Sequence, residues 1–345
     1  MSERFSYEKA GVNIDLSDAT KRAMAKSMET TDPSVLNRFG AFASLYDAEF
    51  PGYEHPVLVT KTEEPGSKQK IALEHGHTRS ICYDLVNHLV NDIIVMGAKP
   101  LAVQDAIICG KLDKKVVSDL VRFIAEACRE QGCSLTGGET SVQPGVVEPG
   151  VYILVASILG VVEKAKILDG GRIAEGDTVL AIASNGLHTN GYSLVRAILA
   201  ARPEILNWTA EGKSFIETIL RPHTCYYPAL QGLLDSAGLH GLAHITGGGI
   251  QDNLDRILPE KLDASIDLGA IRILPVFKLL RDMGSVTDAE MLRTFNMGVG
   301  MTAVVASLAA ETVQKHLADH GCESYVIGRI VPGGKKVAYH GKLTW

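Results

Sequence analysis

Residues 62–68 read T-E-E-P-G-S-K and residues 90–100 read V-N-D-I-I-V-M-G-A-K-P, and the stretch that they enclose decides the fold. It follows a short apolar, β-branched run at residues 56–60, which predicts a strand. It ends near Asp105, in a second apolar run. Acids, a small hydroxyl group and a lysine therefore stand on both sides of one helical segment, and this set is typical of a magnesium–phosphate site.

Alternating strands and helices are predicted outward from this stretch. The enclosed helix is marked by apolar residues at four-residue steps: Ile81, Leu85, Leu89 and Ile93. Further strands are predicted at residues 101–108, 151–162, 177–184, 301–306, 324–330 and 336–340. Further helices are predicted at residues 112–131, 194–201, 250–258, 291–295 and 310–320, with Ser17 as the N-cap of a helix near the N-terminus. The polar, glycine-rich residues 163–176 indicate a boundary between domains of residues 1–165 and 166–345.

The composition narrows the class of protein. The chain has 345 residues and a formal net charge of -6. A protein that binds nucleic acid without sequence preference needs an excess of positive charge, so this class is disfavoured. Its six cysteines form no C-x-x-C pair, which disfavours a zinc site or a disulfide framework. No apolar run approaches the about 18 residues of a membrane span. We therefore expect a cytoplasmic protein with no nucleic-acid partner and no membrane insertion.

Three glycine-bearing loops are candidate ligand sites, and each has a structural interpretation beside the functional one. G-G-E at residues 137–139 is a turn or a place where backbone amides approach a ligand. His188 lies in a polar loop between a strand and a helix, where a hydrogen-bonding role and a catalytic role are equally compatible with the pattern. Three glycines at residues 247–249 favour close backbone approach. Asp92, beside the apolar helix face, is paired or bound to a metal ion if it is buried, and solvated if it is not.

Common nucleotide-binding and hydrolase motifs are absent from the sequence. There is no G-x-G-x-x-G followed by a ribose-binding acid, no G-x-x-x-x-G-K-[ST], no G-x-S-x-G and no H-E-x-x-H. The remaining pattern of glycine turns, a lysine-bearing loop and separated acids favours phosphoryl transfer, in which magnesium bridges phosphate oxygens.

Ordered motifs along the chain resemble one known family. They are S-Y-x-x-A-G-V-x-I-D at residues 6–15, V-N-D at 90–92, D-x-x-x-x-G-K-L-D at 105–113, G-C-S-L-x-G-G-E-T at 132–140, H-x-N-G-Y-S-L-V-R at 188–196, T-G-G-G at 246–249 and R-T-F-N-x-G-V-G-M at 293–301. Together they are similar to aminoimidazole ribonucleotide (AIR) synthetase, also called phosphoribosylformylglycinamidine cyclo-ligase.

The resemblance implies an α/β fold of the α+β type with two domains, in which N-terminal-domain strands of two subunits join in a barrel-like interface of a homodimer. It implies a small-molecule nucleotide substrate, ATP and Mg²⁺. In such enzymes ATP phosphorylates the formamide oxygen of formylglycinamidine ribonucleotide. A nitrogen of the same substrate then closes the imidazole ring of aminoimidazole ribonucleotide, with release of ADP and phosphate, in purine biosynthesis.

The resemblance also implies roles for particular residues. The metal ligands would be Glu63, Asp92 and Asp105. The ATP-binding residues would be Glu63, Gly66, Ser67, Lys68, Asn91, Asp92, Asp105, Gly137, Gly138 and Glu139. The substrate-binding residues would be His188, Thr189, Asn190, Thr246, Gly247, Gly248 and Gly249. The catalytic residues would be Lys68, Asp92, Glu139 and His188.

One loop departs from the family pattern. The family's ATP loop reads G-T-D-G-V-G-T-K, whereas residues 61–68 read K-T-E-E-P-G-S-K, with Glu63, Glu64 and Pro65 at the altered positions. The glycine-rich segment of the family near residues 30–45 is also reduced here. Two alternative functions follow: a diverged paralogue that uses ATP on another substrate, and a non-catalytic nucleotide-binding dimer.

Overall fold

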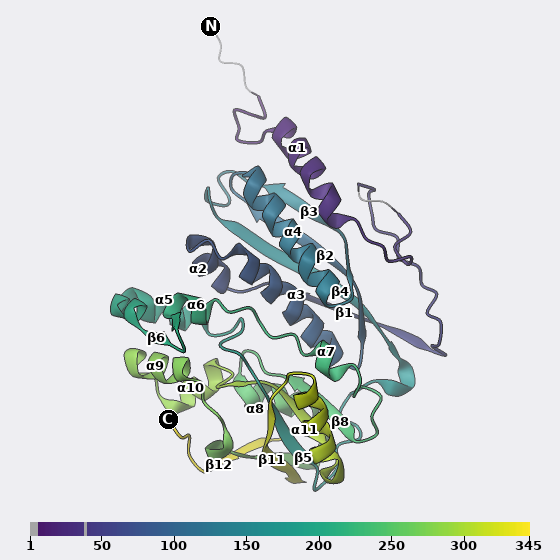
Figure 1. Cartoon of the computed structure of the whole chain (residues 1–345), viewed down its shortest axis with the longest axis vertical. Coiled ribbons are helices and arrows are strands. Elements are labelled where there is room, and N and C mark those ends of the chain that lie inside the picture. The colour runs from purple at the N-terminus through teal and green to yellow at the C-terminus, as the bar shows by residue number, and fades with distance from the viewer. Residues whose placement is uncertain (1–5, 38–39) are drawn as a thin grey trace. The chain divides into compact units, whose positions relative to one another are not determined.

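The computed structural model describes residues 6–37 and 40–345, so Arg38 and Phe39 of the reduced glycine segment lie outside it. The chain forms two compact units (Figure 1). The first comprises Met1–Val90 and Pro100–Val161, and the second comprises Asn91–Lys99 and Val162–Trp345. The expected domain boundary between residues 165 and 166 stays a prediction.

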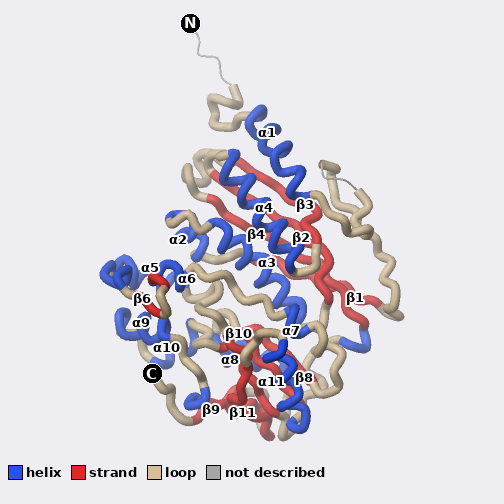
Figure 2. Tube along the Cα trace, in the orientation of Figure 1, coloured by secondary structure: helices blue, strands red, loops and turns tan. Residues whose placement is uncertain are grey.

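The first unit contains a four-stranded sheet in the order β1-β4-β2-β3. Its strands are β1 (Pro56–Glu63), β2 (Lys99–Cys109), β3 (Ser134–Val142) and β4 (Tyr152–Glu163). The helices α2 (Lys68–Glu74), α3 (Thr78–Ile94) and α4 (Lys114–Glu130) lie over one face of this sheet, as Figures 1 and 2 show. Strands β2 and β3 run parallel, so their ends place side chains from both strands at one edge.

Helix α4 forms where the sequence predicts a packing helix. Asp113 caps its N-terminus, because the carboxylate accepts hydrogen bonds from the backbone N–H groups of Lys115 and Val116. Its apolar stripe is buried, with Leu120 and Ile124 fully inaccessible. The helix therefore supports the strands that hold Asp105 and Glu139.

The N-terminal helix α1 (Ile14–Ala25) starts earlier than predicted and packs against α4. Asn13, not Ser17, is its N-cap, because the Asn13 side chain accepts a hydrogen bond of 2.8 Å from the Leu16 N–H. The Ser17 hydroxyl instead donates to the Asn13 carbonyl, four residues back, which is a position inside a helix. The predicted N-cap at Ser17 is therefore wrong.

The second unit contains a six-stranded sheet in the order β12-β9-β11-β5-β10-β8. Every pair of neighbours is antiparallel except β12 and β9. The strands are β5 (Thr178–Ala183), β8 (Leu239–His244), β9 (Leu262–Asp267), β10 (Val299–Val305), β11 (Ser324–Pro332) and β12 (Val337–His340). Strand β10 is buried along its whole length, as expected for a strand with neighbours on both sides.

The other elements of the second unit are mostly short. The helices are α5 (Tyr192–Ala201), α6 (Phe215–Ile219), α7 (Tyr227–Leu230), α8 (Gly249–Leu254), α9 (Pro275–Gly284), α10 (Asp288–Thr294) and α11 (Ala310–Asp319), and β6 (Thr209–Ala210) pairs with β7 (Lys213–Ser214). A short 3-10 helix of the first unit lies at Lys26–Met28. Those of the second unit lie at Lys164–Lys166, Pro203–Asn207, Asp255–Ile257, Leu268–Ala270 and Ser307–Ala309.

Five further elements differ from the sequence predictions. The interpretation of G-G-E as a turn is wrong, because Gly137 and Gly138 lie inside β3 and pair with β2. The helix predicted at residues 250–258 is α8 followed by a 3-10 turn. Strand β9 and helices α2 and α9 were not predicted. Over residues 6–37 and 40–345, none of the helices has the length and apolar character needed to cross a membrane.

Candidate active site

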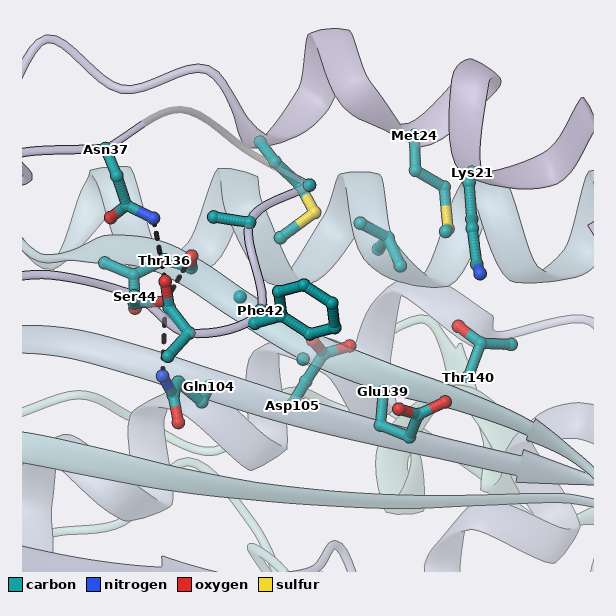
Figure 3. A pocket seen from close by; sticks show the side chains of 17 residues that line it. Lys21, Met24, Asn37, Phe42, Ser44, Gln104, Asp105, Thr136, Glu139 and Thr140 are labelled. Atoms are coloured by element: carbon teal, nitrogen blue, oxygen red, sulfur yellow. Dashed lines mark hydrogen bonds between the residues drawn. The ribbon is translucent and has the colours of Figure 1, made fainter. Parts of the chain in front are cut away.

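A cavity of about 630 Å³ lies in the first unit, between α1, residues 40–44 and strands β2 and β3 (Figure 3). Asp105, Gly137, Gly138 and Glu139, four of the residues expected to bind ATP, line it together. Lys21 extends from α1 toward the strands that hold the two acids. One cation and two carboxylates therefore face a space that is large enough for a small ligand.

The Asp105 carboxylate is buried in this cavity because Gly138 leaves room for it. The two residues are paired across the parallel strands, and a Cβ atom on Gly138 would lie 2.0 Å from Asp105 Oδ1. Burial raises the pKa of Asp105 to about 7. A cation beside this carboxylate would restore its charged form, and carboxylate oxygen is the ligand that Mg²⁺ prefers. The donor set in the cavity therefore fits magnesium.

Residues 40–44 are attached to the strands by side-chain hydrogen bonds. The Ser44 hydroxyl donates to the Thr136 carbonyl at 2.7 Å and accepts from the Gln104 amide at 3.3 Å (Figure 3). The Asn37 amide donates to the Ala43 carbonyl at 2.8 Å. The wall of the cavity that contains Phe42 is thereby held over the strand pair.

The predicted ATP loop does not line this cavity. Lys68, at the start of α2, is fully buried and its Nζ lies 2.8 Å from Asp84 Oδ2. Burial lowers the pKa of Lys68, and the charge of Asp84 opposes that shift. Gly66 has a φ of 64°, in the left-handed region that favours glycine, and Ser67 follows it directly before α2. The roles of Gly66, Ser67 and Lys68 toward ATP stay predictions.

The structure does not group the three expected metal ligands. Glu63 pairs with Lys61 at 3.0 Å, and Asp105 lies in the cavity. Asp92 belongs to the second unit, where its Oδ1 accepts a hydrogen bond of 2.7 Å from His244 Nδ1. Among the residues that the structure describes, no cluster of three potential metal ligands includes Glu63 or Asp105. Their joint role in binding Mg²⁺ stays a prediction.

The second unit brings three histidines together. His188 lies in the loop after β5 with a φ of 60°, and its ring stacks on that of His223 with centroids 3.9 Å apart. His223 Nε2 lies 2.9 Å from His244 Nε2. All three side chains are buried. Gly300 leaves space for this arrangement, since a Cβ there would lie 2.7 Å from His188 Cε1.

Asn91 holds the segment that follows His223. Its side-chain amide donates to the Thr224 carbonyl at 2.8 Å, and its carbonyl accepts from the Tyr226 N–H at 2.9 Å. The residue is fully buried. Asn91 therefore has a structural role in the second unit, and its expected contact with ATP stays a prediction.

The T-G-G-G loop lies beside the histidine loop. A Cβ on Gly247 would lie 3.5 Å from Asn190 Oδ1, so two of the expected substrate-binding residues are neighbours. Thr189, which lies between His188 and Asn190 in the sequence, is also buried. Asn253 holds the T-G-G-G loop in place, because its side-chain amide donates to the carbonyls of Gly247 and Gly249.

Packing explains two of the three consecutive glycines. Gly248 has a φ of 90°, and a Cβ on Gly249 would lie 1.9 Å from the Leu292 carbonyl oxygen. The N–H groups of Gly248 and Gly249 already donate to the carbonyls of Arg293 and Thr246. The part of the loop nearest Asn190, at Gly247, is therefore the better candidate for binding a substrate phosphate.

Sequence reasoning missed several residues of both sites. Lys21 and Phe42 line the cavity, but they lie in polar segments without a motif. His244 had a local signal, since it lies two residues before T-G-G-G. His223 had none, because its neighbours His188 and His244 are 35 and 21 positions away in the sequence.

Two family models match the chain, one for each part of this arrangement. The model described as "AIR synthase related protein, N-terminal domain" matches residues 53–162, and the corresponding C-terminal domain model matches residues 174–341. The chain thus has the two-domain fold of the AIR-synthase-related proteins.

Relatives along the whole chain identify the family. A phosphoribosylformylglycinamidine cyclo-ligase of Carboxydothermus hydrogenoformans is 41% identical over 339 residues, which cover 97% of this chain and 98% of that protein. A protein of the same name from Nitrosococcus oceani is 40% identical over 97% of this chain and 95% of its own length. This chain belongs to the phosphoribosylformylglycinamidine cyclo-ligase family.

Solved structures share the fold at low sequence identity. Thiamine-monophosphate kinase from Stenotrophomonas maltophilia has a TM-score of 0.68 at 16% identity, with 96% of this chain and 98% of that chain covered. The hydrogenase maturation protein HypE in complex with ATP has a TM-score of 0.67 at 17% identity, with 96% and 92% covered. These likenesses concern the fold alone.

Proposed function

We propose that this protein is the ATP-dependent cyclo-ligase that converts formylglycinamidine ribonucleotide to aminoimidazole ribonucleotide in purine biosynthesis. The observation that supports this most strongly is the identity of about 40% with cyclo-ligases along 97% of the chain. It is an ATP-dependent ligase that forms a carbon–nitrogen bond. No observation favours the paralogue with another substrate or the non-catalytic dimer.

The reaction needs an activated oxygen and a positioned nitrogen. Transfer of the γ-phosphoryl group of ATP to the formamide oxygen turns a poor leaving group into a good one. The amidine nitrogen of the same molecule then attacks the activated carbon, and phosphate leaves as the ring closes. The protein contributes by holding both ligands in line and by balancing charge.

We propose the cavity of the first unit as the ATP site. The support is its volume of about 630 Å³, the paired acids Asp105 and Glu139, and the cation of Lys21. Glu63, Asp92 and Asp105 would hold Mg²⁺, which neutralises phosphate charge when bound. Gly137 and Gly138, which line this cavity, would contact the nucleotide there, and Gly66, Ser67, Lys68 and Asn91, which do not line it, stay predicted nucleotide contacts. HypE, a protein of the same fold, has been solved in complex with ATP, which supports binding of a nucleotide by this chain but not its position.

We assign the formylglycinamidine ribonucleotide to the loops of the second unit. His188 and Asn190 would act at the reacting amide, with Thr189 beside them. Thr246 and the three glycines that follow it, Gly247, Gly248 and Gly249, would bind the substrate phosphate. The support is the proximity of Asn190 to Gly247, which brings the two loops together.

We further propose that the protein is a cytoplasmic homodimer with domains of residues 1–165 and 166–345. The support for a dimer is the edge position of β1 in its sheet and the exposure of Leu58, which is 55% accessible on that strand. An apolar side chain on an edge strand favours pairing with a second chain. Light scattering on the purified protein should give twice the mass of one chain.

An activity assay tests the function. Purified protein with ATP, Mg²⁺ and formylglycinamidine ribonucleotide should release one ADP for each aminoimidazole ribonucleotide formed. His188→Asn should abolish the product, because it removes the imidazole. His320→Asn changes an exposed histidine directly after α11 and should leave the product unchanged. ADP release without the imidazole product would contradict the proposal.

A further inference from the structure

Three buried imidazoles converge within the second unit. One ring nitrogen from each of His188, His223 and His244 can be chosen so that all three atoms lie within 4.8 Å of one another. The side chains are 1%, 1% and 5% exposed. Three histidines that come from separate segments and meet away from solvent form a ligand set with a defined geometry.

The closest contact in this set joins two nitrogens that cannot both donate. His223 Nε2 and His244 Nε2 lie 2.9 Å apart, so one of them carries a proton and the other accepts it with its lone pair. The carboxylate of Asp92 accepts from His244 Nδ1 at 2.7 Å, which directs the lone pair of His244 Nε2 toward His223. A metal ion can take the place of that proton, because it is bound by the same lone pairs.

The contact of Asp92 with His244 is the arrangement found behind metal-bound histidines. A carboxylate that accepts from one ring nitrogen fixes the tautomer and makes the other nitrogen a better ligand. It also offsets part of the charge of a buried divalent ion. Asp92 would act here through His244.

The donor type selects the class of ion. Imidazole nitrogen suits Zn²⁺, Co²⁺ and Ni²⁺, whereas Mg²⁺ prefers oxygen ligands such as those of Asp105. Two nitrogens bound to one tetrahedral zinc ion lie about 3.3 Å apart. His223 and His244 must therefore separate by a few tenths of an ångström, and the stacked ring of His188 must rotate to join them.

We propose that His188, His223 and His244 form a binding site for a zinc-class divalent ion, with Asp92 orienting His244. Three imidazoles leave a fourth position of the tetrahedron open to water or to a ligand oxygen. This site differs from the magnesium site proposed for ATP in its nitrogen ligands, and the two proposals assign different roles to Asp92. It goes beyond the proposed cyclo-ligase activity and does not depend on it.

The backbone around the histidines supports the site. His188 is held in the left-handed region by its loop, and Gly300 provides the space against its ring. Asn91 anchors both Thr224 and Tyr226, which follow His223. His244 ends strand β8. The backbone of each ligand is therefore fixed by a neighbouring element, so that metal binding requires only movements of the side chains.

Metal titration of the full-length protein tests the proposal. The chain is stripped with a chelator, and Co²⁺ or Zn²⁺ is added while heat and visible absorption are recorded. The wild type should bind one equivalent, with the absorption of tetrahedral cobalt, and an excess of Mg²⁺ should not compete. Zn²⁺ should also raise the Tm of the wild type, because it binds the folded state.

Variants locate the ion. His223→Asn should abolish the stoichiometric binding, and His223→Cys, which restores a zinc ligand, should recover it. Asp92→Asn should weaken binding by roughly 10- to 100-fold. His320→Asn serves as the control, because His320 also stacks on a histidine, His316, at 4.2 Å but lies in none of the three-ligand clusters of the described chain.

Two results would overturn the proposal. One is a wild type that binds no stoichiometric Zn²⁺ or Co²⁺ and shows no change of Tm. The other is equal binding by the wild type and by His223→Asn. Because every readout is metal binding or thermal stability, failure here leaves the cyclo-ligase assay unaffected, and the reverse also holds.

Discussion

The ammonium group of Lys68 lies 2.8 Å from the Asp84 carboxylate, and both side chains are completely buried. The pair joins the start of α2 to α3 inside the first unit. Two opposite charges in the interior stabilise each other, but each would be strongly destabilising alone. The lysine that the family resemblance predicts to bind ATP phosphates therefore lies in the core.

Removing one partner of this pair should destabilise the protein severely. Lys68→Met leaves a buried carboxylate and Asp84→Asn leaves a buried ammonium group, so each should lower the free energy of unfolding by about 3–5 kcal/mol. The double change Lys68→Met with Asp84→Leu removes both charges and should recover most of the loss. Urea unfolding followed by circular dichroism measures all three.

An exposed pair on the same helix is the matched control. Lys70 and Glu74 lie 2.7 Å apart with more than half of each side chain accessible. Lys70→Met should change the free energy of unfolding by less than about 1 kcal/mol. Equal effects at Lys68 and Lys70 would mean that the buried pair does not stabilise the first unit.

The regular elements around this pair could be predicted from the sequence because they follow periodic rules. The four-residue steps from Ile81 to Ile93 predict α3, which spans Thr78–Ile94. The apolar run at residues 56–60 predicts β1, which is longer at its C-terminal end, to Glu63. The pairing of Lys68 with Asp84 was not predictable, since a charged pattern does not reveal whether both partners are buried.

The stability of the metal-free protein should depend on pH through Asp105. Its pKa in the folded state is about 7, compared with an ordinary value of 3.8. Between these values the folded state keeps a proton that the unfolded state has lost, so the free energy of unfolding should fall as pH rises, by up to about 4 kcal/mol.

Asp105→Asn removes the titrating group and should flatten this pH dependence, with a gain in stability near about pH 8. Urea unfolding at about pH 5 and about pH 8 compares the two proteins. Asp18→Asn, at an exposed acid of α1, should behave as the wild type. A pH dependence that survives in Asp105→Asn would refute the assignment.

Adding one methyl group at Gly300 should disturb the histidine site. A Cβ there would lie 1.8 Å from Tyr226 Oη and 2.7 Å from His188 Cε1, so both side chains must move. We expect Gly300→Ala to lower stability by about 1–3 kcal/mol and kcat by up to about 100-fold. Thermal unfolding and steady-state kinetics measure the two effects.

Gly334 provides the control for that substitution. A Cβ on Gly334 meets no atom within 4 Å, so Gly334→Ala should leave Tm and kcat unchanged. If Gly300→Ala were as harmless as Gly334→Ala, His188 and Tyr226 would not need the space that glycine leaves.

Neutralising Glu64 should tighten ATP binding. Glu64 adds a negative charge to the predicted phosphate loop, and its carboxylate accepts a hydrogen bond of 3.3 Å from Gln69. Glu64→Gln keeps an acceptor and removes the charge, so the Kd for ATP with Mg²⁺ should fall by roughly two- to fivefold. The effect should shrink with added salt.

Calorimetric titration with ATP measures this change, and Glu74→Gln on α2 is the control for an exposed glutamate. The same Kd for Glu64→Gln, Glu74→Gln and the wild type would place residues 61–68 away from the triphosphate.

The site residues were predictable where a local motif and a local structure coincide. The G-G-E motif predicted residues that line the cavity, although its glycines lie in a strand and not in a turn. Glycine is needed at Gly138 because a side chain there would collide with Asp105 on the neighbouring strand. The histidine cluster was not predictable. It depends on the pairing of His223 with His244 through space, and no rule of spacing along the chain brings those two residues together.

The transfer of an oxygen atom tests the central claim most directly. Formylglycinamidine ribonucleotide labelled with oxygen-18 in the formyl group is incubated with the protein, ATP and Mg²⁺, and the phosphate is examined by mass spectrometry. Our account predicts one labelled oxygen in each phosphate released, together with unlabelled aminoimidazole ribonucleotide. Unlabelled phosphate, or hydrolysis of ATP without ring closure by the folded protein, would contradict it.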